Sequence, residues 1–136
     1  MQAAAAGTGV RLSDGSTNIL PVGKAEDVEA AWANHYRLVR RSLERGFYQG
    51  WDLHPGQLPT RYAATYAFYR DALPRALERL AAYTQHATHG IADEPATARA
   101  LASYVVRGLQ SGAVDEAEVL SGAGLGTDQL VHLTSR

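Results

Sequence analysis

The sequence contains no cysteine. Disulfide bonds, thiolate catalysis and cysteine-ligated zinc are therefore excluded for this chain, and the absence is consistent with a reducing compartment. Long apolar runs are missing too, since no stretch reaches the roughly 20 residues that a membrane helix requires. The N-terminal residues lack the basic start and apolar segment of a signal peptide. We therefore expect a cytoplasmic protein with no membrane partner.

An excess of basic charge is also missing. Thirteen Lys and Arg residues stand against fourteen Asp and Glu residues, which gives a formal net charge of −1. Nucleic-acid binding requires a basic patch or stripe, so we expect no nucleic-acid partner. The 136 residues are enough for one domain with a modest core.

Hydrophobic periodicity and turn residues predict alternating strands and helices in the first part of the chain. The long helices show apolar residues at helical spacing, and Pro74 is expected to kink the second of them. The expected elements are strands at about 9–13 and 50–54, helices at about 26–45 and 60–83, and a helical cap over 85–136.

The two strands lie about forty residues apart with a long helix between them, which predicts a βαβ unit with parallel strands. Two parallel strands alone do not make a stable sheet, because parallel sheets have more strands and both faces covered. We therefore expect residues 1–84 to be a partial (β/α) barrel segment within something larger, followed by the helical cap. The expected fold class is α/β, mostly helical by residue count.

Polar side chains share one face of each predicted strand. Arg11 and Ser13 alternate with apolar residues, and so do Asp52 and His54. In an α/β barrel the inner face at the carboxyl ends of the strands is where chemistry takes place. The candidate pocket residues are Arg11, Ser13, Asp14, Asp52, His54 and Gln57.

The alternatives for these residues are structural. Each strand could be an edge strand with one solvated face. His54 could orient the turn between strand and helix, Asp52 could pair with Arg11, and Gln57 could brace the turn. The tyrosines at 62, 66 and 69 have helical spacing, and we expect them to form a buried face of their helix.

Two motifs carry a resemblance to a known family. "LSDG" (Leu12 to Gly15) and "WDLHPGQL" (Trp51 to Leu58) resemble the ends of the last two strands in the citrate lyase β-subunit and HpcH/HpaI-type aldolase superfamily. The likeness covers about residues 7–83, and the stretch from Leu43 to Arg70 looks like an actinobacterial branch of those aldolases. It implies two βα units of a TIM barrel.

The resemblance also implies an activity. Such enzymes are carbon–carbon lyases that use magnesium and act on 2-keto acids or hydroxyacyl thioesters such as acyl-CoA. The family's metal-binding carboxylates lie on earlier strands, so we expect this chain to lack the magnesium ligands and to be inactive without the missing strands. We assign no catalytic residue and expect a homo-oligomer. The alternative is a non-catalytic helical oligomerisation or interaction module left from a truncated aldolase.

Overall fold

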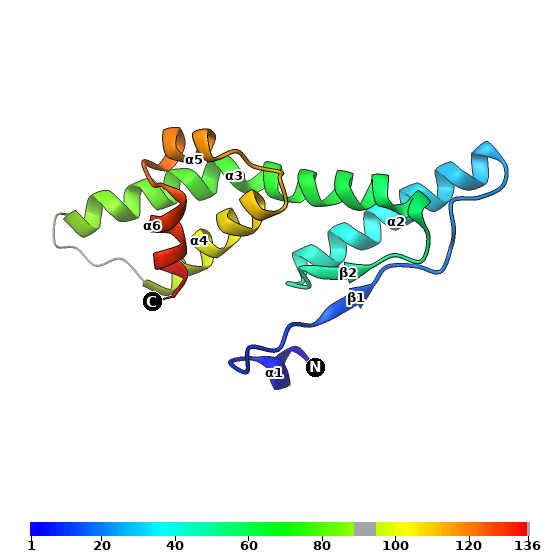
Figure 1. The fold of residues 1–136 in the computed structure, drawn as a ribbon, viewed down its shortest axis with the longest axis horizontal. Helices are drawn as coiled ribbons and strands as arrows, with labels where there is room; N and C mark the ends of the chain where they lie inside the picture. Colours follow the sequence, from blue (N-terminus) through cyan, green and yellow to red (C-terminus); the bar gives the residue numbers. More distant parts are fainter. Residues whose placement is uncertain (89–94, 136) are drawn as a thin grey trace. The chain divides into compact units, whose positions relative to one another are not determined.

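The computed structural model describes residues 1–88 and 95–135. Within them the chain is mostly helical and contains a two-stranded sheet, which is an α/β arrangement (Figure 1). The elements, in chain order, are α1 (Gln2–Ala5), β1 (Ser13–Gly15), α2 (Ala25–Glu44), β2 (Gln49–Trp51), a 3₁₀ turn (Pro55–Gln57), α3 (Leu58–Thr88), α4 (Pro95–Gln110), α5 (Glu116–Ala123) and α6 (Thr127–Thr134).

The parallel pairing predicted for the two strands is confirmed. Ser13 pairs with Gln49, and Gly15 pairs with Trp51. Both strands are shorter than expected, and β1 begins four residues late. In this register, the residues before Ser13 would have to pair with the residues before Gln49. Those residues instead form the turn that follows α2 at Gly46, so β1 begins only at Ser13.

β2 ends at Trp51 rather than at residue 54 because a side chain, instead of a neighbouring strand, accepts the next backbone hydrogen bonds. The Gln57 side-chain oxygen accepts hydrogen bonds from the backbone N–H groups of Leu53 and His54. Backbone donors that a side chain satisfies do not need a neighbouring strand. The sequence "WDLHPGQ" therefore folds as a short strand followed by a side-chain-braced turn.

Helix α2 confirms the expected helix to within one residue at each end. Glu26 and Asp27 lie in its first turn, where negative charge suits the helix dipole. Gly46 follows its end with a φ of 81°, a conformation that favours glycine. Trp32 of this helix is 37% exposed, and its indole N–H donates to the Gly56 carbonyl at 2.7 Å.

Helix α3 begins two residues earlier and ends five residues later than expected, and Pro74 lies inside it. Ala64 is fully buried against Val39 and Leu43 of α2, and Phe68 packs on the same cluster. The expected buried tyrosine face is wrong for two of its members. Tyr62 is 57% exposed and Tyr66 is 38% exposed, whereas Tyr69 is 3% exposed.

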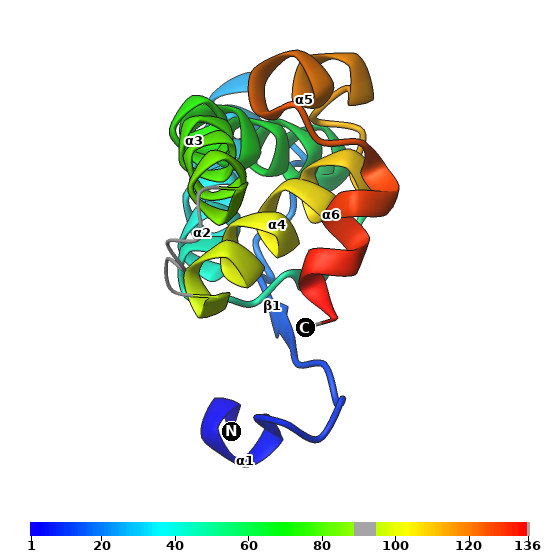
Figure 2. The ribbon, with the colours of Figure 1, turned by 90° about the vertical axis from the view of Figure 1, so that its left-hand side faces the viewer.

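The chain divides into two compact units, residues 1–68 and residues 69–136. This grouping differs from the expected division after residue 84, because the second part of α3 packs with the helices that follow it. In unit 2, α4 packs against α6, and the two helices lie side by side in both views (Figure 1, Figure 2). In the described part of the expected helical cap over 85–136 lie the helices α4, α5 and α6. Asp93 or Glu94, followed by Pro95, has the sequence pattern of a helix cap, and both acidic residues lie outside the described residues.

In residues 1–88 and 95–135, no helix is both long and apolar enough to cross a bilayer.

Candidate functional site

Asp52 lies at the centre of a polar cluster at the end of β2. Its Oδ1 accepts from His35 Nε2 of α2 at 2.8 Å and from Arg61 Nη2 of α3 at 2.8 Å. Its Oδ2 accepts from Arg61 Nε at 3.0 Å, so the guanidinium binds the carboxylate through two nitrogens. The Asp52 side chain is only 11% exposed. The cluster joins the strand end to both long helices.

His35 extends this cluster into the start of α3. Its ring is completely buried, and its Nδ1 lies 2.7 Å from Thr60 Oγ1. The Thr60 hydroxyl is also 3.0 Å from the Gln57 carbonyl oxygen. An ionised carboxylate can only accept hydrogen bonds, so the His35 Nε2 that faces Asp52 carries a proton.

Asp52 has a perturbed acidity. Burial raises the pKa of Asp52, but the hydrogen bonds from Arg61 and His35 outweigh burial and hold the pKa below its usual value. The carboxylate is therefore ionised at neutral pH. The ionised Asp52 carboxylate accepts hydrogen bonds on both oxygens. It therefore holds the neighbouring side chains in place and has little tendency to take up a proton.

Gln57 is the second fixed point of the site. It is completely buried, and its amide nitrogen donates to the carbonyls of Thr17 and Ile19 at 3.3 and 3.4 Å. Its oxygen accepts from Leu53 and His54, as described above. One side chain therefore ties the turn after β2 to the loop after β1. These contacts match the structural alternative for Gln57, in which its side chain braces the turn.

His54 caps the turn that follows β2. Its Nδ1 accepts from the backbone N–H of Gly56 at 3.0 Å. A Cβ atom on Gly56 would lie 2.9 Å from the Pro21 ring and 3.0 Å from His54 Nδ1, so glycine lets the two loops approach. The structural alternative for His54, orientation of the strand-to-helix turn, matches this contact.

The candidate residues from the sequence do not converge on one pocket. Asp14 accepts a hydrogen bond from Ser42 of α2 at 2.5 Å, so Asp14 and Asp52 both face the helices. Ser13 alternates with Asp14 and is exposed, and Arg11 is exposed as well. The expected partner of Asp52, Arg11, is replaced by Arg61 and His35.

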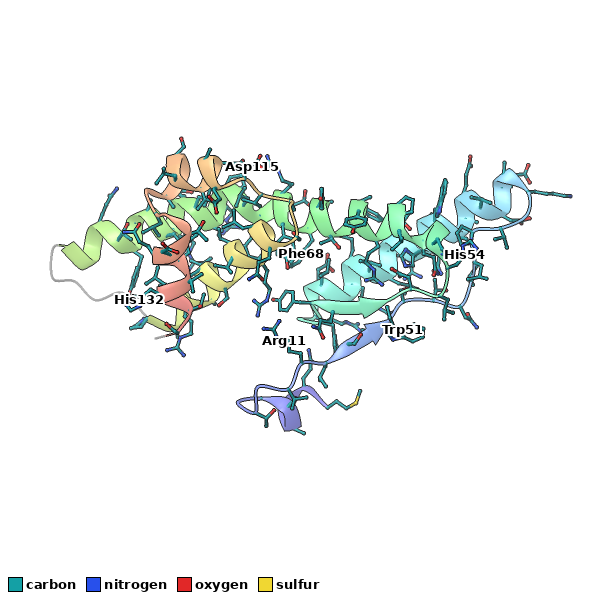
Figure 3. The ribbon with its side chains drawn as sticks, viewed as in Figure 1. Arg11, Trp51, His54, Phe68, Asp115 and His132 are labelled. Carbon is teal, nitrogen blue, oxygen red and sulfur yellow. The ribbon has the colours of Figure 1, made fainter. Side chains whose placement is uncertain are left out.

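The two faces of the strands differ sharply. On the helix side, a Cβ on Gly50 would lie 2.6 Å from Arg61 Nη1, so the guanidinium covers this glycine. On the other side, Trp51 lies over Gly15, where a Cβ would be 2.6 Å from the indole ring. Trp51 is 54% exposed and Leu53 is 53% exposed. Figure 3 labels Trp51 and His54 in the region where β2 ends. The open face carries the apolar Trp51 and Leu53 beside the polar Ser13 and Gln49, whereas the face of Asp52 is closed by the helices.

The arrangement offers no metal site of its own. Among residues 1–88 and 95–135, no group of three His, Cys, Asp or Glu side chains could hold an ion. The carboxylates of Asp14 and Asp52 are already engaged by Ser42, His35 and Arg61.

The sequence reasoning missed His35, Thr60 and Arg61. A signal for His35 was present, because it lies four residues from Ala31 and four from Val39, on the buried face of α2. A histidine at a core position needs polar partners. Arg61 gave no comparable signal, since its contact with Asp52 depends on the turn that brings α3 back along the strand.

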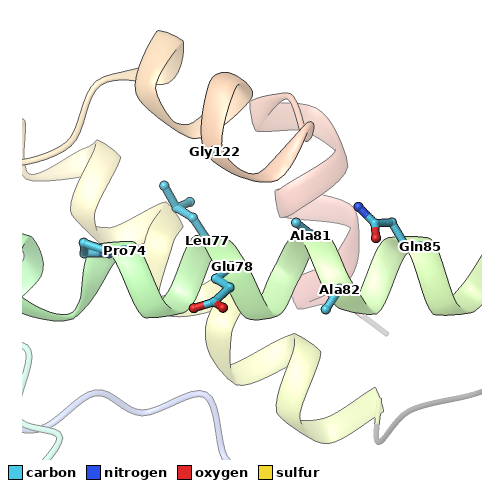
Figure 4. Close-up of a pocket in the computed structure, with 7 residues that line it drawn as sticks. All are labelled: Pro74, Leu77, Glu78, Ala81, Ala82, Gln85 and Gly122. Carbon is cyan, nitrogen blue, oxygen red and sulfur yellow. The ribbon is translucent and has the colours of Figure 1, made fainter.

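Unit 2 contains an open groove of about 510 Å³. Figure 4 shows its lining, with Leu77 directed at Gly122. Apolar and small side chains dominate it, and Glu78 and Gln85 provide its polar groups. The lining residues are Pro74, Leu77, Glu78, Ala81, Ala82, Gln85 and Gly122. Binding sites usually have several polar groups that converge on a ligand, and the side chains that line this groove include two.

No curated protein and no solved structure matches the chain. A family described as a domain of unknown function (DUF6986) matches residues 1–136. The chain therefore belongs to the DUF6986 family.

Proposed function

We propose that this chain forms two βα units of a carbon–carbon lyase of the aldolase type, with a TIM-barrel fold completed by further strands. The substrate class is a 2-keto acid or a hydroxyacyl thioester. The chain contributes part of the barrel wall and of the pocket, and the catalytic and metal-binding groups come from strands outside it. The proposal begins from the resemblance carried by "LSDG" and "WDLHPGQL".

The observation that supports the proposal best is the parallel pairing of β1 and β2 across helix α2, with one open face. Both long helices contact the same side of the strands, through Asp14 and Asp52. The opposite side exposes Trp51 and Leu53. Parallel strands are normally covered on both faces, so the open face fits an interior that additional strands would enclose.

In this arrangement, substrate contacts are expected on the strand face opposite to Asp52. In an α/β barrel the helices lie outside and the opposite side of each strand faces the interior. Ser13, Trp51 and Leu53 then face the interior, and Asp52 belongs to the outer layer. The role of the Asp52 cluster is to hold the strand ends at a fixed position against α2 and α3.

Magnesium, which the resemblance implies, would be held by carboxylates outside this chain. Such an ion would supply Lewis-acid chemistry at a substrate carbonyl. The contribution of this chain is to position and enclose the substrate. Gln57 and His54 fix the turn, and the indole of Trp51 excludes water from the wall beside it.

The test uses the longest reading frame that contains this chain. Purified protein is assayed with and without magnesium for release of a 2-keto acid from a 4-hydroxy-2-oxo acid, and of an acyl-CoA from a hydroxyacyl thioester. We expect magnesium-dependent turnover of one class. A folded protein that turns over neither class with magnesium present would overturn the proposal.

A matched pair of variants tests the assignment of the interior face. Leu53→Arg places a charge on the open strand face, and Leu120→Arg does the same at a leucine of unit 2 that is 58% exposed. We expect Leu53→Arg to lower kcat/KM by roughly tenfold or more and Leu120→Arg to leave it unchanged. Equal effects would remove Leu53 from the pocket wall.

The second candidate, a non-catalytic interaction module, is favoured by a different observation. The first turns of α3 expose Leu58, Tyr62 and Tyr66 on one face of a helix. Such a face is typical of an interaction surface rather than of a catalytic one. The magnesium-dependent assay above distinguishes the two candidates.

A further inference from the structure

The first turns of helix α3 carry an exposed apolar stripe, which we define as Leu58, Tyr62 and Tyr66. We propose that this α3 stripe is a homodimer contact, in which two copies of the chain pair antiparallel about a two-fold axis at Tyr62. The inference goes beyond the proposed lyase function and does not depend on it.

The stripe is a continuous surface on one side of the helix. Its members are spaced by four residues, so they lie above one another along α3. Leu58 is 46% exposed, Tyr62 57% and Tyr66 38%. The rings of Tyr62 and Tyr66 meet edge to face, with centroids 6.0 Å apart and an angle of 88° between the ring planes. The two tyrosines therefore form a preorganised aromatic surface.

The opposite side of the same turns is already covered. Ala64 and Phe68 pack against Val39 and Leu43 of α2, and Arg61 binds Asp52. A helix of an isolated soluble chain normally turns polar or charged residues to the side that does not face the core. These turns of α3 have an apolar stripe there instead, which is the pattern of a helix that is covered on both sides.

The apolar spacing continues along α3 into residues that are covered. Tyr69, Leu73, Leu77 and Leu80 follow at intervals of three or four residues, and they are between 0% and 6% exposed within unit 2. There the helices of unit 2 cover them, and Tyr104 packs its ring against Tyr69 at 5.2 Å. The stripe therefore continues a packing pattern whose later residues are already a helix–helix interface.

Charge limits the kind of partner that fits. From Leu58 to Tyr69 the only charged residue is Arg61, and its guanidinium is bound to Asp52. A surface without free charge offers nothing to a nucleic acid or to an acidic or basic peptide. The chemistry that fits is another apolar helix face.

A second copy of this chain supplies such a face with matching spacing. Leu58 and Tyr66 lie at equal distances on either side of Tyr62, so an antiparallel pair places Tyr62 opposite its twin and Leu58 opposite Tyr66 of the other copy. This is the self-complementary pattern of a two-fold interface. Three side chains per copy make a small contact, so we expect a dimer that dissociates on dilution in the range of about 1 to 100 μM.

Cysteine cross-linking tests the geometry directly, because the full chain contains no cysteine of its own. We expect Tyr62→Cys to give a disulfide-linked dimer under mild oxidation. Tyr66→Cys alone should give none, because in this arrangement the two copies of position 66 lie about 12 Å apart along the helix axis, beyond the reach of a disulfide. The double variant Leu58→Cys/Tyr66→Cys should restore cross-linking. Equal cross-linking by the two single variants would overturn the two-fold arrangement.

Analytical ultracentrifugation of the full chain tests the association itself. We expect a monomer–dimer equilibrium that Tyr62→Glu weakens by at least about tenfold, since a buried charge at the axis would meet its twin. Tyr36→Glu is the matched control, because Tyr36 is a 36%-exposed tyrosine of α2 that lies off the stripe. Tryptophan fluorescence checks that both variants remain folded. A wild-type chain that stays monomeric at 100 μM, or equal effects of the two variants, would overturn the proposal.

Discussion

At the scale of single residues, Asp52 and Gln57 do most to hold the strand ends in place. Asp52 joins β2 to α2 and α3 through His35 and Arg61, and Gln57 joins the turn after β2 to the loop after β1. Both are side chains of the "WDLHPGQ" segment. Its polar residues therefore stabilise the local fold, whatever the open face of the strands binds.

Asp52→Asn is expected to lower the free energy of unfolding of unit 1 by about 2–4 kcal/mol at pH 7. The amide keeps the shape of the side chain but leaves Arg61 and His35 without their ionised acceptor. Urea unfolding followed by tryptophan fluorescence measures the loss. Glu29→Gln on the exposed side of α2 is the control and should change the unfolding free energy little.

The effect of Asp52→Asn should depend on pH with a definite sign. The pKa of Asp52 is lowered in the folded protein, so its carboxylate contributes stability that is fully present above the unfolded pKa of about 3.9. That stability is lost as the pH falls through the folded-state pKa. We therefore expect the gap between wild type and variant to close below about pH 4. A constant gap from pH 7 to pH 3 would contradict the role given to the ionised carboxylate.

Gln57→Ala is expected to destabilise unit 1 by roughly 2–4 kcal/mol, because it leaves buried backbone groups of two loops without partners. The affected groups belong to Thr17, Ile19, Leu53 and His54. Gln49→Ala, at an exposed glutamine of β2, provides the control. A Gln57→Ala midpoint in urea equal to that of the control would show that the brace is dispensable.

At the scale of elements, close helix packing in unit 2 depends on Gly122. A Cβ at this position would lie 2.7 Å from Leu77 Cδ1 and 3.3 Å from Leu77 Cβ. The second distance involves an atom close to the backbone of α3, which a rotamer change moves very little. Helix α5 therefore lies against α3 only because residue 122 lacks a side chain.

Gly122→Ala should lower the thermal stability of unit 2, with a cost of about 1–3 kcal/mol for overpacking. Far-ultraviolet circular dichroism of the helices measures the shift. Ser121→Ala is the natural comparison, since Ser121 is the exposed neighbour on the same helix. If the two variants melt at the same temperature, α5 has room to move away from Leu77.

At the scale of the whole molecule, each of the two compact units has its own buried residues. Val39, Leu43 and Ala64 form the core cluster of unit 1, whereas Leu80 and Leu130 are fully buried in unit 2. Both tryptophans, Trp32 and Trp51, lie in unit 1. Tryptophan fluorescence therefore reports on unit 1, and circular dichroism reports on the helices of both units.

We expect the two signals to separate in the variant Asp52→Asn. The fluorescence midpoint in urea should fall to lower concentration than the circular dichroism midpoint, because the lost contacts belong to unit 1 alone. Coincident midpoints in the variant would mean that the chain unfolds as one cooperative body.

The sequence alone determined the order of the elements, because its signals are local. The spacing of apolar residues predicts α2 and α3, and the separation of the two strands predicts their parallel pairing. It also predicted Gln57 and His54 as structural residues of a turn, as one of two alternatives. These features depend on neighbours within a few residues or on chain connectivity.

The tertiary structure decided which face of each strand is open. Alternation along a strand says that Asp52 and Trp51 point in opposite directions, but it does not say which direction meets the helices. Arg61 and His35 decide that, because α2 and α3 bring a cation and an imidazole to the side of Asp52. The exposure of Tyr62 and Tyr66 was decided in the same way, since helical spacing gives a common face and only packing determines whether that face is covered.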